Sequence, residues 1–150
     1  MKLEFESTVN SDSATLWNWI ISKRGINSEL FPLVYMTKLD IFSTITAENF
    51  EPGKVIVSSW ILLFGFIPVD RLRITPVEIV EGQHFIEESP MFTMKKWRHE
   101  RYVIPTQNAC QVKDIIVFEP LAFKTIVSIF VKLLFRNRHK NLRKKFSIVK

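Results

Sequence analysis

The 150-residue chain contains little cysteine and little glycine. Cys110 is the single cysteine, so no disulfide can form within the chain, and this fits a reducing compartment. The four glycines form no glycine-rich phosphate-binding loop. The longest apolar stretch, residues 126–135, is too short to span a bilayer and contains Lys132. We therefore expect a soluble cytoplasmic protein, whose charged, alternating first residues indicate a strand and not a signal peptide.

Acidic residues are missing from the C-terminal part of the chain. Residues 120–150 carry nine basic and no acidic side chains, whereas residues 1–119 carry 12 basic and 15 acidic ones. The net charge of +6 therefore belongs to the C-terminal segment. A nucleic-acid surface would spread its charge more widely, which disfavours nucleic acid as a partner. Two explanations stay open: a solvated helix face whose cations suit the helix dipole, or transient contact with a membrane surface.

Recognisable metal-binding and catalytic motifs are also missing. His84, His99 and His139 lack the spacing of metal ligands. No Gly-x-Ser-x-Gly motif is present. Cys110 follows a predicted hairpin turn without a neighbouring cation in the sequence, which indicates a bystander rather than a nucleophile. We therefore predict neither a metal site nor a cofactor.

Aromatic and aliphatic side chains, by contrast, are abundant. The chain is 47% hydrophobic and contains thirteen Phe and four Trp. This exceeds what an ordinary core needs, and a large interior lined by aromatic side chains would use the excess. The length predicts one domain, residues 1–150, which can bury roughly 70% of the surface of its unfolded chain.

The hydrophobic pattern predicts an α+β fold. A helix capped by Ser11 or Asp12 is expected to end at residues 23–25, and a second short helix is expected from residue 26 or 27 to residue 31. A long helix is expected to follow Pro120. Alternating segments separated by turns predict antiparallel strands at residues 2–9, 34–45, 54–64, 69–80, 84–88, 93–105 and 110–118.

The terminal helix is predicted to be amphipathic and to cover the concave face of the sheet. Its apolar face is expected to comprise Phe123, Ile126, Val127, Phe130, Leu133 and Leu134. Its opposite, polar face is expected to comprise Thr125, Ser128, Lys132, Arg136, His139 and Arg143. A sheet that closes around one helix often leaves a cavity between them.

The hairpin formed by residues 92–102 and 112–118 places ionisable groups on an interior face. Strand alternation puts Trp97, His99 and Arg101 on one side. Folding about the turn brings Arg101 near Asp114, His99 near Ile116, and Trp97 near Phe118. Because an unpaired buried charge costs several kcal/mol, Arg101 and Asp114 are expected to pair. The pair is either structural or the polar end of a ligand site, and both roles are compatible.

Several short motifs resemble those of the helix-grip superfamily. Residues 9–17 (VNSDSATLW) resemble its first strand-to-helix step, and residues 50–53 (FEPG) resemble its turn before the central strands. A bacterial uncharacterised branch has a G-P-F-x-x-W-x-H strand, then an Asp, then F-x-x-R-H on the last helix. The matching positions are residues 89–92 (SPMF), Trp97, His99, Asp114 and residues 135–139 (FRNRH). Ser89 replaces the glycine, and the spacing from Phe92 to Trp97 is longer than the pattern.

This superfamily includes START-type lipid carriers, birch-pollen-allergen relatives, polyketide cyclase-like proteins and coenzyme Q-binding proteins. The resemblance implies a curved antiparallel sheet of about six to seven strands around a long C-terminal helix, with two short helices after the first strand. It also implies a cavity for an apolar small molecule such as a lipid, an isoprenoid quinone or a polyketide. The matching site positions are Trp97, His99, Asp114, Arg138 and His139, and the resemblance assigns none of them a role.

We hypothesise that the chain binds or carries an apolar or amphipathic small molecule. This role favours a non-catalytic ligand-binding protein and leaves open whether the chain is an enzyme. The polar end of the ligand would meet His99, Arg101 and Asp114. The apolar wall is predicted to comprise Trp60, Leu62, Phe64, Leu72, Phe85, Trp97, Ile116, Phe118, Ile126, Phe130 and Leu134.

Two alternatives belong to other classes. A cyclase- or dehydratase-like enzyme would use His99 as general acid or base and Arg101 to stabilise an enolate oxygen. An interaction module would dock through its basic C-terminal helix on an anionic membrane or on nucleic acid.

Overall fold

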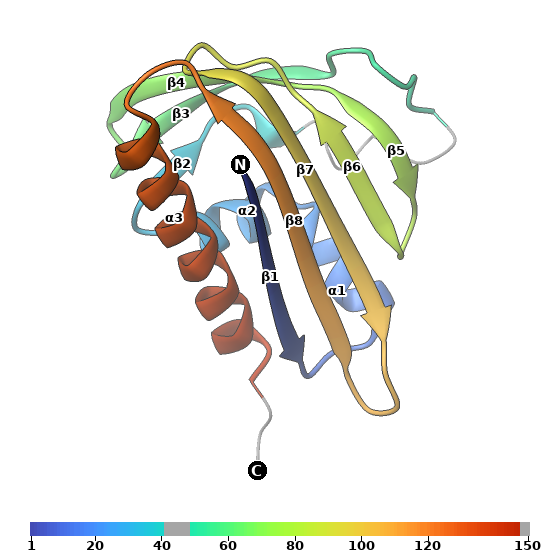
Figure 1. Ribbon diagram of the computed structural model, residues 1–150. Coiled ribbons are helices and arrows are strands. Elements are labelled where there is room, and N and C mark those ends of the chain that lie inside the picture. The colour runs from blue at the N-terminus through green and yellow to red at the C-terminus, as the bar shows by residue number, and fades with distance from the viewer. Residues whose placement is uncertain (41–48, 148–150) are drawn as a thin grey trace.

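The computed structural model describes residues 1–40 and 49–147, and it confirms the α+β class. Two short helices follow the first strand, and a long helix ends the fold (Figure 1). The described elements are β1 (Lys2–Val9), α1 (Ser13–Ile20), α2 (Lys23–Leu30), β2 (Val34–Met36), β3 (Val57–Leu63), β4 (Ile67–Ile74), β5 (Pro76–Val80), β6 (His84–Glu88), β7 (Met94–Pro105), β8 (Cys110–Pro120) and α3 (Lys124–Lys145).

The strands form two antiparallel sheets that curve around one interior. One sheet has the order β1-β8-β7-β6-β5 and the other has the order β2-β3-β4. Only Thr75 separates β4 from β5, so the chain passes directly from one sheet into the other. The long helix α3 packs against β1, β8 and α2 (Figure 1). The predicted curved sheet around a C-terminal helix is thus confirmed, and the break at Thr75 divides the strand expected at residues 69–80.

The start of α2 differs from the sequence-based prediction. Residues 23–25 were expected to end the first helix, but they form the first turn of α2. Ser22 caps this turn, because its Oγ accepts a hydrogen bond of 2.9 Å from the Gly25 backbone N–H. A Cβ at residue 25 would lie 1.8 Å from the Trp19 carbonyl oxygen. Gly25 therefore allows α1 and α2 to approach closely and does not stop a helix.

The second strand is shorter than predicted. Only Val34–Met36 of the expected strand 34–45 is a strand, because Lys38 turns the backbone to a positive φ of 58°. Residues 41–45 of that prediction lie outside the described residues.

The pairing of β7 with β8 is confirmed in its predicted register. Arg101 lies opposite Asp114, His99 opposite Ile116, and Trp97 opposite Phe118. The regular alternation of buried and half-buried residues along β8 leaves little freedom for a slip of one residue, which would move every side chain to the other face.

The helix α3 buries a different face from the one predicted. Its buried residues are Val131, Phe135, Arg138, His139 and Leu142. Phe123, Ile126 and Leu133 were expected on the packed face but are exposed. The prediction that His139 lies on a solvated face is also wrong. The apolar residues that predicted the packed face lie in the first half of the helix, whereas most of its buried residues lie in the second half.

Candidate functional site

A cavity of about 560 Å³ lies between the curved sheets, the two short helices and α3. This volume falls within the range of typical small-molecule sites. Its walls are mainly aliphatic and aromatic side chains from α1, α2, β2 to β7 and α3. The polar groups of the lining are few, so an occupant would meet a largely apolar surface.

The structure divides the predicted site residues into two groups. Those that line the cavity are Phe64, Leu72, Phe85, Trp97, His99, Ile126, Phe130 and Leu134. Those that do not line it are Trp60, Leu62, Arg101, Asp114, Ile116 and Phe118. The second group lies outside the cavity lining, which corrects the predicted wall at these positions. Contact of the predicted site residues with a ligand stays a prediction.

Trp60 and Leu62 lie on the other face of β3 from the one predicted. Ile61 and Leu63 line the cavity instead. Trp60 is exposed, with the Arg71 guanidinium 5.4 Å from its ring centroid.

Ile116 and Phe118 point inward as predicted but lie beneath other side chains. Both are buried, in the cluster that contains Phe135 and packs against Trp97. The ring centroids of Trp97 and Phe118 are 6.1 Å apart. Trp97 and Phe135 thus stand between these β8 residues and the cavity.

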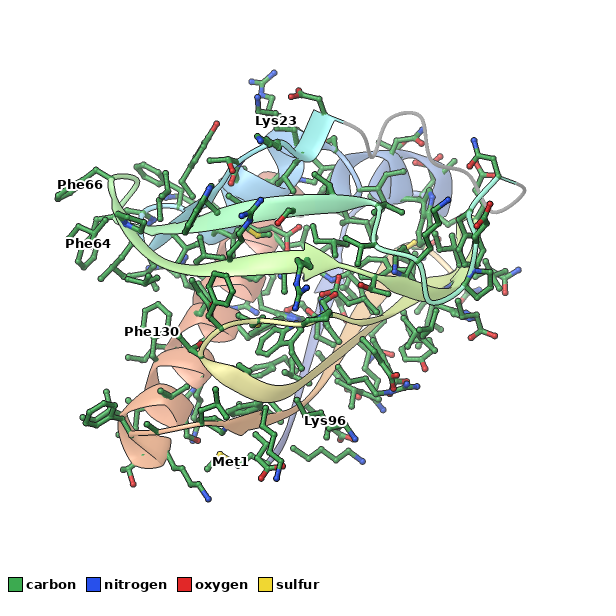
Figure 2. The ribbon with its side chains drawn as sticks, turned by 90° about the horizontal axis from the view of Figure 1, so that it is seen from above. Met1, Lys23, Phe64, Phe66, Lys96 and Phe130 are labelled. Atoms are coloured by element: carbon green, nitrogen blue, oxygen red, sulfur yellow. The ribbon has the colours of Figure 1, made fainter. Side chains whose placement is uncertain are left out.

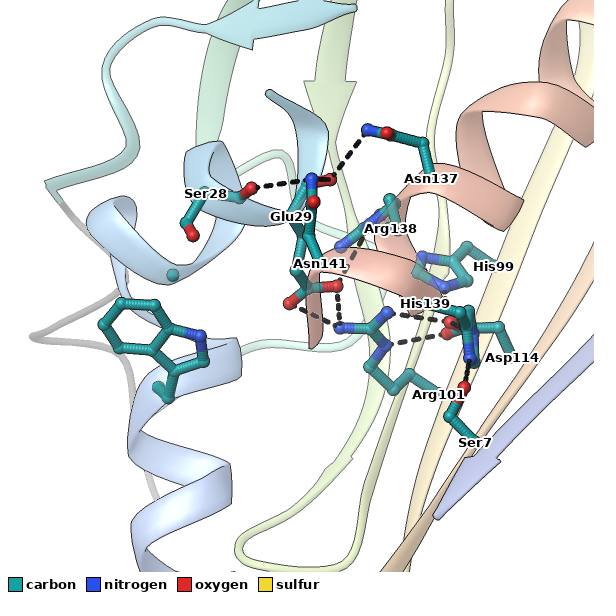
Figure 3. A network of polar contacts seen from close by, with 12 residues as sticks. Ser7, Ser28, Glu29, His99, Arg101, Asp114, Asn137, Arg138, His139 and Asn141 are labelled. Carbon is teal, nitrogen blue, oxygen red and sulfur yellow. Dashed lines mark hydrogen bonds and ion pairs between the residues drawn. The ribbon is translucent and has the colours of Figure 1, made fainter. Parts of the chain in front are cut away.

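Behind the cavity wall, Asp114 is the centre of a buried polar network (Figure 3). Its carboxylate accepts bonds of 2.7 Å from both Nε and Nη2 of Arg101. It also contacts His99 Nε2 at 2.8 Å and His139 Nε2 at 2.7 Å. A carboxylate only accepts, so both imidazoles donate from Nε2. Asp114 therefore orients two histidines as well as pairing with Arg101.

Glu29 is the second carboxylate of the network. One of its oxygens lies 2.8 Å from Arg101 Nη1 and accepts a 3.3 Å bond from Arg138 Nε. The α3 side chain Asn141 also donates to the Glu29 carbonyl oxygen (Figure 3). It donates to the Phe31 carbonyl oxygen as well. These contacts join α2, α3 and the β7–β8 hairpin. The two guanidinium groups and two carboxylates have cancelling formal charges.

A short chain of hydrogen bonds leads from His139 to the surface. Its Nδ1 lies 2.6 Å from Ser7 Oγ, and that hydroxyl accepts a 2.7 Å bond from Arg143 Nη1. With Nε2 donating to Asp114, the neutral His139 ring accepts the Ser7 proton at Nδ1. Both ring nitrogens of His139 are thus occupied, so His139 has a positioning role and no free nitrogen for a ligand.

The charges within the network shift the pKa values of its members, and they keep Asp114 and Arg101 ionised. Burial alone would raise the pKa of Asp114, but the Arg101 guanidinium and the bonds from Arg101, His139 and His99 hold it well below the usual 3.8. Burial would lower the pKa of Arg101, and the charges of Asp114 and Glu29 overcome this and raise it. Burial and the neighbouring Arg101 lower the pKa of Arg138.

His99 and Arg138 connect the network to the cavity, since both line it. No described residue bonds to His99 Nδ1 or to the terminal Nη atoms of Arg138. Every buried side-chain nitrogen or oxygen of the described residues has a partner, so these unpartnered atoms retain open surface. The Phe135 ring lies 5.2 Å from the His99 ring and 5.1 Å from Arg138 Cζ. The cavity therefore has a polar end around Phe135.

Sequence reasoning missed Glu29 and Ser7. Glu29 lies 72 residues from Arg101 along the chain, and Ser7 lies 132 residues from His139. Neither belongs to a local pattern that indicates burial. Arg138 and His139 were identified only through the F-x-x-R-H resemblance, which carried no role for them.

The remaining charged groups on the cavity wall are carboxylates: Asp70, Glu81 and Glu87. Asp70 accepts backbone N–H bonds from Arg71 at 2.7 Å and Phe92 at 2.8 Å. Glu87 accepts from Trp97 Nε1 at 3.3 Å. Among the described lining residues, the single guanidinium of Arg138 thus faces three carboxylates.

Residues 1–40 and 49–147 lack two further features, a metal-binding cluster and a membrane-spanning helix. No group of three or more His, Cys, Asp or Glu side chains is arranged to hold a metal ion. No helix there combines the length and apolar character that crossing a membrane requires.

The architecture is the helix-grip fold, and comparisons with known structures agree. Protein CV1439 from Chromobacterium violaceum matches with a TM-score of 0.74 at 9% identity over 99% of this chain and 98% of that chain. A START superfamily protein from Mycobacterium smegmatis matches with a TM-score of 0.61 at 7% identity over 95% and 97%. Ara h 8.0201 matches with a TM-score of 0.63 at 14% identity over 97% of both chains. At these identities the matches show the fold alone.

The chain belongs to the family described as Domain of unknown function (DUF8410), whose model matches residues 7–146. No curated protein matches its sequence.

Proposed function

We propose that the protein binds an uncharged, mainly apolar small molecule whose polar end both donates and accepts hydrogen bonds. An alcohol or a phenol is such a molecule. The observation that carries this proposal is the apolar cavity with His99 and Arg138 at its polar end. The helix-grip fold, which the START superfamily neighbour shares, supports a ligand-binding role.

The apolar wall would supply most of the binding free energy. Burial of apolar surface is favourable by about 25 cal/mol per Å², and only the part that exceeds the loss of ligand freedom appears as affinity. Trp17 of α1 and Trp97 of β7 both line the cavity, so indole rings from two elements would be available to an occupant.

The polar end favours a hydroxyl group. Arg138 offers N–H donors only, whereas His99, donating from Nε2 to Asp114, offers the Nδ1 lone pair as an acceptor. A hydroxyl can accept from the guanidinium and donate to the imidazole. A hydrocarbon would leave both groups without partners in an apolar environment, which is unfavourable.

The charges favour a neutral ligand over an anion. The guanidinium and carboxylate charges behind His99 already cancel, and Asp70, Glu81 and Glu87 face the same space. A carboxylate ligand would add negative charge where compensating cations are scarce, and it would meet the lone pair of His99. Burying such a charge without a full partner is unfavourable.

Thermal denaturation with 1-decanol, decanoate and decane tests this proposal. We expect 1-decanol to raise the melting temperature saturably and to bind at least about tenfold more tightly than decanoate, a difference of roughly 1.4 kcal/mol. Leu134→Trp should abolish the shift, because Leu134 lines the cavity. Leu133→Trp is the matched control, since Leu133 is the exposed neighbour on the same helix. Failure of all three ligands to stabilise the wild-type protein would overturn the proposal.

A second candidate function is proton abstraction next to a carbonyl, which the oriented His99–Asp114 pair supports. His99 Nδ1 would take a proton from the carbon next to the carbonyl, and an Arg138 N–H would donate to the resulting enolate oxygen. Arg101 does not fit the role first expected of it, because it is 0% exposed and bound to Asp114 and Glu29. Incubation with 2-decanone in D₂O would then yield deuterated ketone, and His99→Gln should not. Equal deuteration by both proteins would contradict catalysis by His99.

A further inference from the structure

One side of the molecule carries an exposed apolar surface, which we call the rim patch. Its hairpin part comprises Phe64, Phe66, Ile67 and Val69, between and within β3 and β4. Its helical part comprises Phe123, Ile126, Ile129 and Leu133 of α3 and its N-cap. Figure 2 shows Phe64 and Phe66 at the hairpin tip, on the same side as Phe130 of α3.

The rim patch coincides with the opening of the cavity. Phe64, Val69 and Ile126 are exposed and also line the cavity. A residue that meets both bulk solvent and the cavity lies at its mouth. One opening of the cavity thus lies between the β3–β4 hairpin and α3.

Two phenylalanines of the rim patch have unfavourable backbone conformations. Phe64 has φ 55° and Phe123 has φ 52°, and only Lys38 joins them among the non-glycine residues of the described chain. Bulky side chains rarely adopt this left-handed region, where Gly or Asn is favoured. Phe123 is nevertheless 77% exposed, so core packing does not account for its side chain. Such outliers point to a role outside folding.

The rim patch is flanked by cations and has no carboxylate in its own segments. Residues 60–69 contain no charged side chain, and residues 120–147 contain basic but no acidic ones. Lys124, Lys132 and Arg136 are exposed on α3. Apolar and aromatic side chains bordered by Lys and Arg suit the interface of an anionic bilayer, where aromatic rings insert at headgroup depth and cations meet lipid phosphates.

We propose that the rim patch docks on the surface of an anionic lipid bilayer, with the cavity opening toward the lipid. Phe64, Phe66 and Phe123 insert between the headgroups, and Lys124 and Lys132 lie against phosphates. A second copy that docked through the same rim patch would give the cations no matching charge, because the segments of that patch carry no carboxylate. This docking goes beyond ligand binding and does not depend on it.

Co-sedimentation with vesicles tests the docking. We expect the wild-type chain to bind phosphatidylcholine vesicles containing about one-third phosphatidylglycerol and to bind pure phosphatidylcholine at least about tenfold more weakly. Raising the salt to roughly 0.5 M should weaken binding, because charges are screened. Phe66→Ser/Ile129→Ser should reduce binding at least about tenfold, whereas both residues lie outside the cavity lining, so the 1-decanol shift should persist.

Val55→Ser/Ile104→Ser is the matched control, because it replaces two exposed apolar residues outside the rim patch and should not alter binding. Absence of binding to anionic vesicles would overturn the proposal, as would equal binding by both double variants. Sedimentation velocity in the absence of lipid gives a further check. A wild-type dimer that Phe66→Ser/Ile129→Ser dissociates would show that the rim patch is a self-association surface, which also overturns the proposal.

Discussion

Asp114 determines how the polar residues of this fold are arranged. It is 0% exposed and faces Arg101, His99 and His139, which come from two elements. A buried ion pair is weak evidence of stability in itself, but removal of one partner leaves an uncompensated charge. The network therefore holds β7, β8, α2 and α3 in fixed positions relative to one another. It also fixes the orientation of the His99 ring at the cavity wall.

Substitution of Asp114 by asparagine tests this role. The variant keeps the shape of the side chain but leaves Arg101 with Glu29 as its remaining anion. We expect the free energy of unfolding, measured by urea titration, to fall by about 3–5 kcal/mol. Glu4→Gln is the control, because the Lys2–Glu4 pair is exposed and should contribute within about 0.5 kcal/mol. A loss below about 1 kcal/mol for Asp114→Asn would show that the network is not stabilising.

The low pKa of Asp114 also predicts a pH dependence. The native carboxyl has a pKa below the ordinary 3.8, so the unfolded chain binds a proton more readily. The stabilisation is present above that value and is lost as the pH falls through the native pKa. The difference in stability between wild type and Asp114→Asn should therefore shrink when urea titrations at pH 7 are repeated near pH 3. A difference that is the same at both values would contradict this.

The sequence predicted contacts correctly between residues that face each other across a single hairpin turn. The Arg101–Asp114 pair follows from alternation and from one turn, so its register was accessible. The contact between Arg101 and Glu29 was not, because it depends on how α2 docks in three dimensions. The same holds for Ser7 and His139.

At the scale of elements, α3 shows why an amphipathic pattern is insufficient by itself. Its second half buries Arg138 and His139 because Glu29 and Asp114 neutralise or orient them, a fact that hydrophobicity does not encode. Its first half leaves Ile126 and Ile129 exposed because the cavity mouth, and not the core, lies there. Each half therefore departs from its own sequence pattern, and each departure lies at a candidate functional surface.

The junction of α1 and α2 gives a prediction at this scale. Gly25→Ala would place a Cβ 1.8 Å from the Trp19 carbonyl oxygen, so backbone must move. Gly82→Ala meets no atom within 4 Å but has φ +78°. We expect Gly82→Ala to reduce the free energy of unfolding by about 1–2 kcal/mol and Gly25→Ala to reduce it further, as measured by urea titration. Equal losses would mean that α1 and α2 do not need the close approach.

At the scale of the whole molecule, two sheets and one helix enclose more space than they fill. Protein interiors are normally close-packed, so a cavity of about 560 Å³ forgoes many contacts. Element order and the helix-grip resemblance predicted the architecture. The division into two sheets at Thr75, the volume of the cavity and the site of its mouth depend on strand curvature and side-chain packing, which the sequence pattern does not specify.

Native mass spectrometry of the protein with 1-decanol tests most directly whether that space takes a ligand. The wild type and Leu133→Trp should each show a one-to-one complex that dissociates on activation, and Leu134→Trp should show none, because its indole occupies the cavity. Absence of the complex in the wild type, or equal complex formation by all three proteins, would contradict the account.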